Sequence, residues 1–159
     1  MSEPRTARFD TRTQFQQELR SLLAHARVTL DLFDPDFALF TLGTPETDAE
    51  LRRFLRAGGT LRLAMHESAW LERNAPRFLR LLRDHSHRIE CRVTPRGLRQ
   101  LTDSFAIADA TDVVRRFHSD HLRGAAAFGA PDQAELPRER FNAIWVESLP
   151  GLHPTVTGL

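Results

Sequence analysis

Lysine is absent from this sequence of 159 residues, so all 22 of its basic side chains are arginines. The absence excludes a Schiff base and a lysine general base, because both require a primary amine. Arginine still allows a phosphate or carboxylate group to be bound through two parallel hydrogen bonds. We therefore expect any anion site in this protein to depend on arginine.

Cysteine and long apolar runs are also scarce. The single cysteine, Cys91, cannot form an internal disulfide. It alternates with Ile89 and Val93 in a strand pattern, which predicts a buried and inert thiol. No apolar run is long enough to span a bilayer, and the start, Met-Ser-Glu-Pro-Arg, lacks the apolar segment of a signal peptide. We therefore expect a cytoplasmic protein without a membrane span.

Positive and negative side chains are nearly equal in number, and the formal net charge is +1 at pH 7. This balance gives no bulk attraction to nucleic acid. We also find no aromatic residue interleaved with a basic patch, as single-strand binding requires. The sequence thus carries no strong nucleic-acid signal. With 41% hydrophobic and 27% charged residues, it is typical of one globular domain with a substantial core.

Helical and strand-like segments alternate along the chain. Helical spacing predicts helices that begin near Thr11 or Thr13, Thr47, Trp70 and Pro137. Alternation or β-branched composition predicts strands at residues 28–33, 60–65, 89–93, 104–108, 113–117 and 121–128. This order predicts an α/β domain with a mixed, mostly parallel sheet and helices on both faces. A flavodoxin-like α/β sandwich is the alternative fold.

The predicted domain spans residues 14–148. Residues 1–13 are expected to form a flexible N-terminal arm, and residues 149–159 a C-terminal tail. In the last predicted helix, Phe141, Ile144 and Trp145 fall on one side. We expect this stripe to belong to the core.

The stretch from Leu101 to His118 predicts two short strands joined by a polar turn at Asp109. It resembles the signature segment of the phospholipase D superfamily. There a histidine, a lysine two residues later and an aspartate five residues further on open a β-hairpin. Here the aspartate corresponds to Asp109, whereas Thr102 and Ser104 stand at the histidine and lysine positions. The resemblance extends over roughly residues 14–148, as a single repeat.

In that superfamily the histidine attacks phosphorus and the lysine holds the phosphate oxygens. Thr102 is a poor substitute nucleophile without an adjacent base, and Ser104 supplies no positive charge. The resemblance therefore implies a non-catalytic phospholipase-D-like module for binding or regulation, with no catalytic residue and no cofactor. Because active members need two repeats that face each other, it also implies a homodimer.

Four residues are candidates for an anion site: Thr102, Ser104, Arg116 and His118. If residues 113–118 are extended, Arg116 and His118 share a face, and we expect them beside the first two. The expected ligand is a phosphate-bearing small molecule. The alternative is an Arg116 that pairs with Asp109 or Asp112, next to a solvated His118. We expect Asp109 to fix the turn rather than to act in catalysis.

Two other functions stay open on the sequence alone. One is a phosphodiesterase or nuclease that uses His118 as a displaced nucleophile, and the other is a structural dimerisation domain. His118, Asp120 and His121 also have side chains that bind zinc. Adjacent side chains on a strand diverge, however, and no further ligand is evident. We therefore expect no metal site.

Overall fold

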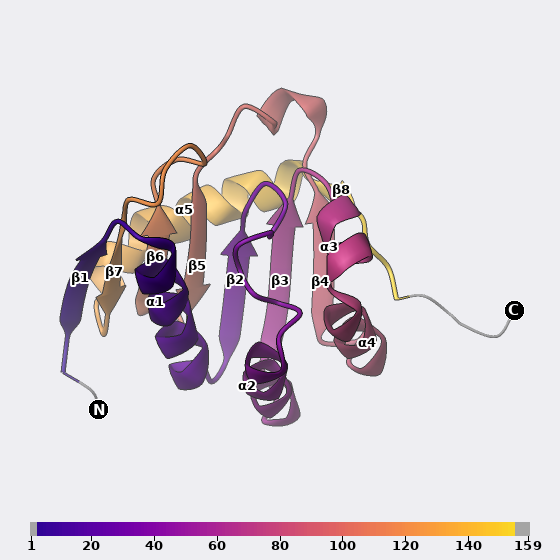
Figure 1. Cartoon of the computed structure of the whole chain (residues 1–159), viewed down its shortest axis with the longest axis horizontal. Helices are drawn as coiled ribbons and strands as arrows, with labels where there is room; N and C mark the ends of the chain where they lie inside the picture. Colours follow the sequence, from indigo (N-terminus) through magenta and orange to yellow (C-terminus); the bar gives the residue numbers. More distant parts are fainter. Residues whose placement is uncertain (1–2, 155–159) are drawn as a thin grey trace, which may run out of the picture.

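Eight strands form a single sheet in the computed structural model, which describes residues 3–154 (Figure 1). The order across the sheet is β1-β7-β6-β5-β2-β3-β4-β8. The strands are β1 Arg5–Phe9, β2 Thr29–Phe33, β3 Thr60–Met65, β4 Ile89–Val93, β5 Ser104–Ala108, β6 Asp112–Arg116, β7 Gly124–Phe128 and β8 Leu149–Pro150.

Parallel pairing is confined to the three strands β2, β3 and β4, and all other neighbours are antiparallel. The predicted mixed sheet is confirmed, but the expectation that it would be mostly parallel is wrong. The connections from β5 to β6 and from β6 to β7 are short. A short connection can join only antiparallel neighbours, because parallel strands need a long crossover. The strands β1 and β8 then add one further antiparallel pair at each edge of the sheet.

Helices cover both faces of the sheet, as predicted (Figure 1). On one face lie α1 Arg12–His25, α2 Pro45–Arg56, α3 Ala69–Asn74 and α4 Pro76–Asp84. On the other face lies α5 Pro131–Glu147, and a short 3-10 helix, η1 Arg96–Leu98, precedes β5. The sheet therefore separates two apolar clusters. Phe15 and Phe54 belong to the first, and Phe105, Phe141 and Trp145 belong to the second.

The N-terminal arm differs from the expectation. Residues 5–9 form β1, which pairs with β7 along its whole length and buries Phe9. The prediction of a flexible arm is therefore wrong for residues 5–9. Residues 1–2 lie outside the described part of the chain. At the other end, β8 places residues 149–150 of the expected tail in the sheet, and residues 155–159 lie outside the described part.

The predicted helix starts are correct at one end of the chain and wrong at the other. Thr11 caps α1, with its side chain accepting a hydrogen bond from the Gln14 amide. In contrast, α5 begins at Pro131 and contains Pro137 in its interior. Proline at a first helical position needs no partner for the missing N–H. In the sequence, Pro131 and Pro137 are both suited to the first position of a helix. This explains why the start of the last helix was predicted at Pro137 instead of Pro131.

Two predictions about chemistry agree with the structure. Cys91 is buried, and burial, followed by the charge of Glu90, raises the pKa of its thiol to about 12. Within residues 3–154, none of the helices has both the length and the apolar character needed to cross a bilayer.

Candidate functional site

The candidate residues lie where β2, β3 and β6 end and β5 begins, at one end of the sheet. Ser104, the first residue of β5, is directly opposite Arg116, the last residue of β6. Both side chains are buried, with 0% of Ser104 and 6% of Arg116 exposed. The β2–β5 register continues this row to Asp34, the residue after β2. A carboxylate, a hydroxyl and a guanidinium thus come from three adjacent strands.

Ser104 is committed to Asp34. Its hydroxyl donates a hydrogen bond to the Asp34 carboxylate, and both groups are buried. Asp34 also accepts hydrogen bonds from the backbone amides of Asp36 at 3.0 Å and Phe37 at 2.6 Å. Burial raises the pKa of Asp34 more than these hydrogen bonds lower it. At the position where the resemblance places a cationic lysine, this chain has a serine bound to a buried carboxyl group.

Arg116 lines a cavity of about 450 Å³ together with Thr102. Its Nε donates to the backbone oxygen of His118 at 3.2 Å. Within residues 3–154 it forms no ion pair with a carboxylate. Arg140, on the same cavity wall, is held by Asp103 through contacts of 2.7 and 3.1 Å. Of these two arginines, Arg116 therefore presents the less engaged guanidinium. Arg115 also lines this cavity and forms no ion pair within residues 3–154.

The alternative partners of Arg116 are occupied elsewhere. Asp109 has a left-handed backbone with φ of 56° in the β5–β6 turn. Its carboxylate accepts hydrogen bonds from the amides of Arg27, Val28 and Thr29 at 2.7–3.3 Å. The Asp112 carboxylate accepts from the Gly129 amide at 2.8 Å. These contacts agree with the expected turn-fixing role of Asp109.

His118 lies outside the cavity wall. Strand β6 ends at Arg116, so the alternation that would place both side chains on one face does not continue. The His118 ring accepts a hydrogen bond from the Asp120 amide at 3.0 Å, and its side chain is 45% exposed. Its ring lies 6.0 Å from that of His121, and no cluster of three metal-binding side chains occurs in the described part of the chain. The structure thus brings Thr102 and Arg116 to one cavity, but not Ser104 and His118.

Sequence comparison assigns the chain to a family. Residues 11–153 match the family model of DUF7931, a domain of unknown function. The chain belongs to this family. No curated protein matches the sequence.

Solved structures resemble this DUF7931 domain in fold. Nuc, a phospholipase D family member from Salmonella typhimurium, has a TM-score of 0.69 and 14% identity, over 94% of this chain and 99% of Nuc. NucT from Helicobacter pylori has a TM-score of 0.62 and 8% identity, over 94% and 100%. TrmBL2, an archaeal chromatin protein, has a TM-score of 0.68 and 13% identity, over 95% of this chain but 54% of TrmBL2. The DUF7931 domain therefore has a phospholipase-D-like fold, as the signature segment indicates.

Two further residues at this end of the sheet, Asp34 and His66, are not among the four candidates from the sequence. Asp34 stands directly after a predicted strand, which is a position where site residues gather in α/β sheets. His66 follows β3 and joins two segments: one ring nitrogen lies 2.6 Å from the Thr94 hydroxyl and the other 2.6 Å from the Leu101 backbone oxygen. His66 thus fixes the segment that leads into Thr102.

Proposed function

We propose that this protein is a non-catalytic phospholipase-D-like module that binds a small phosphate-bearing ligand in the cavity lined by Thr102 and Arg116. The observation that carries the proposal is the state of Arg116. Its side chain is 6% exposed, it borders a cavity of about 450 Å³, and it has no carboxylate partner in residues 3–154. A guanidinium in this setting is suited to two parallel hydrogen bonds with phosphate.

The surroundings of Thr102 support the non-catalytic part of the proposal. A hydroxyl nucleophile needs a base within hydrogen-bond reach. Among residues 3–154, Asp103 is the one carboxylate on the cavity wall and is paired with Arg140, and no histidine of this range lines the cavity. The alternative of a phosphodiesterase with a displaced nucleophile has less support, because the His118 ring lies outside this cavity.

The proposed site is narrower than the four candidates from the sequence. Thr102 and Arg116 are retained as ligand-binding residues. Ser104 is left out because its hydroxyl is bound to Asp34, and His118 because it does not border the cavity. The homodimer, the cytoplasmic location and the regulatory role stay predictions.

Isothermal titration calorimetry with inorganic phosphate tests the proposal. We expect Arg116→Gln to weaken phosphate binding by about tenfold or more, because a hydrogen bond to a charged group contributes about 1.5–3 kcal/mol. Arg56→Gln, an exposed arginine in α2, is the matched control and should bind like the wild type. Circular dichroism would verify that Arg116→Gln folds. Thr102→Ala gives a second, milder test if it does not. Equal binding by all four proteins, or binding by none, would refute the site.

A further inference from the structure

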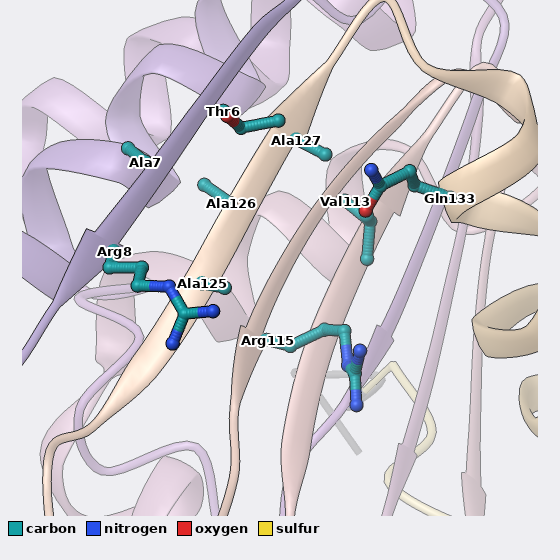
Figure 2. Close-up of a pocket in the computed structure, with 9 residues that line it drawn as sticks. All are labelled: Thr6, Ala7, Arg8, Val113, Arg115, Ala125, Ala126, Ala127 and Gln133. Atoms are coloured by element: carbon teal, nitrogen blue, oxygen red, sulfur yellow. The ribbon is translucent and has the colours of Figure 1, made fainter.

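A second hollow lies on the α5 face of the sheet, over β1, β7 and β6 (Figure 2). Its volume is about 360 Å³. Arg8, Ala125 and Arg115 are register partners across the three strands. The two exposed arginines therefore stand on either side of a small alanine floor, and Figure 2 shows their guanidinium groups directed to different places rather than to one point.

An exposed aromatic ring continues this surface. Phe117 follows β6, and its amide donates to the Arg123 backbone oxygen at 3.0 Å, so strand-like pairing extends by one residue. Alternation then places Phe117 and Arg123 on the same face as Arg115. The Phe117 side chain is 44% exposed, and the guanidinium carbon of Arg115 lies 5.5 Å from its ring centroid. Phe117, Arg8 and Arg123 also line one adjoining cavity.

The charge of this surface is positive. Arg8, Arg115 and Arg123 form no ion pair with a carboxylate in residues 3–154. The nearby carboxylates are Asp10, which lines the adjoining cavity, Asp103, which is paired with Arg140, and Asp120, whose side chain is 83% exposed. Three guanidinium groups without a carboxylate partner in residues 3–154 thus lie on the same surface as one exposed ring.

From this arrangement we propose that the surface formed by Arg8, Arg115, Phe117 and Arg123 binds single-stranded nucleic acid. Neighbouring strands lie about 4.8 Å apart, so the Cα atoms of Arg8 and Arg115 are roughly 10 Å apart. Cations distributed in this way match successive phosphates of a chain better than one small anion. The Phe117 ring offers a surface on which an unpaired base stacks, as in proteins that bind single strands.

The inference reverses an expectation from the sequence. The net charge of +1 averages over the whole chain and conceals a local excess of arginine. Arg8 lies in β1 and Phe117 follows β6, and the sheet order brings these two distant segments of the chain together. Arg115 and Phe117 also line the cavity beside Thr102 and Arg116, so the two surfaces adjoin. Arg8 and Arg123 do not line that cavity, so their variants test this surface separately from phosphate binding by Arg116.

Fluorescence anisotropy with labelled oligothymidylate and oligouridylate tests this surface, and a duplex of the same length serves as comparison. Phe117→Ala should weaken binding of the single strands by about fivefold to a hundredfold, the range for loss of one stacking platform. Arg8→Gln with Arg123→Gln should lower the slope of log affinity against log salt by about 0.7 for each arginine removed. The matched control is Arg20→Gln with Arg56→Gln, which removes the same charge from helices on the other face. The two labelled strands distinguish DNA from RNA.

Preference for single strands over the duplex, together with both losses, would support the proposal. Three results would overturn it: no binding of either strand, equal loss in the control pair, or unchanged affinity in Phe117→Ala. Phe117→Leu keeps an apolar side chain at this exposed position without an aromatic ring. It should reproduce the loss seen in Phe117→Ala, and full affinity in that variant would also contradict stacking.

Discussion

Asp109 joins two parts of the chain that are far apart in sequence. Its carboxylate accepts from three successive amides, those of Arg27, Val28 and Thr29, while its own backbone has a positive φ of 56°. Asp and Asn are the non-glycine residues that best tolerate this conformation. The aspartate of the signature segment therefore anchors the start of β2 to the β5–β6 turn.

Replacement of this anchor should destabilise the fold. We expect Asp109→Ala to lower the free energy of unfolding by about 2–4 kcal/mol. The change removes a charged hydrogen-bond acceptor, and alanine has no polar side chain to stabilise a backbone with positive φ. Asp109→Asn should cost less, because an amide oxygen remains. Urea denaturation gives both values. Asp120→Ala, at an exposed carboxylate, should change stability by less than about 0.5 kcal/mol. A cost for Asp109→Ala as small as that would show that the anchor is dispensable.

Asp34 should make stability depend on pH in a direction that is unusual for a carboxyl group. Burial raises the pKa of Asp34 above 3.8. Between that value and the raised pKa, the folded state binds more protons than the unfolded state, so the free energy of unfolding falls as the pH rises. Asp34→Asn removes this contribution. Relative to the wild type, the variant should gain stability as the pH rises from about 4 to 7.

Urea denaturation of both proteins at several pH values measures this difference directly. Taking the difference cancels the contributions of the other carboxyl groups. Asp120→Asn serves as the exposed control, and its difference from the wild type should stay flat. If the stability of Asp34→Asn relative to the wild type stays constant, or decreases as the pH rises, the raised pKa is contradicted.

Among the helices, α5 illustrates what periodicity predicts well. Trp145 is 7% exposed, as its spacing from Phe141 and Ile144 predicts. Its ring stacks on Phe141 with centroids 5.6 Å apart, and the Arg92 guanidinium lies 4.3 Å from the ring centroid. Spacing predicts which side of a helix is buried because the helix fixes that geometry locally.

Loss of this ring should be costly. Trp145→Ala should destabilise the protein by about 3–5 kcal/mol, the usual cost of emptying a large aromatic site. Its neighbour Val146 is 72% exposed, so Val146→Ala should be close to neutral. Denaturant unfolding of the two variants provides the comparison. Similar midpoints for both would mean that the α5 stripe contributes little to the core.

Strand β1 illustrates what periodicity does not predict. The sequence Arg-Thr-Ala-Arg-Phe has only one buried residue, Phe9, and its partner β7 lies near the other end of the chain. Edge strands have weak patterns because one side of the backbone and much of one face are exposed. The prediction of a mostly parallel sheet is wrong for a related reason, because the direction in which two strands pair depends on how distant segments assemble. The same long-range assembly creates the basic surface around Phe117.

For the whole molecule, the sequence predicts the fold better than the site. The signature stretch, the helix–strand order and the final helix are local patterns, and the phospholipase-D-like fold follows from them. The site depends on contacts between distant residues. Ser104 binds Asp34, and β6 ends before His118, so two of the four candidates lie away from the cavity. Thr102 and Arg116 were identified because both lie within the signature stretch.

The central claim is that this phospholipase-D-like module binds a phosphate group without cleaving a phosphodiester. The most direct measurement is release of nitrophenolate from a chromogenic phosphodiester by protein that calorimetry shows to bind phosphate. We predict no release above the uncatalysed rate for the wild type, because Asp103 on the cavity wall is paired with Arg140 and no histidine among residues 3–154 lines the cavity. Release by the wild type that disappears in His118→Ala would contradict the claim and support the alternative of a phosphodiesterase that depends on His118.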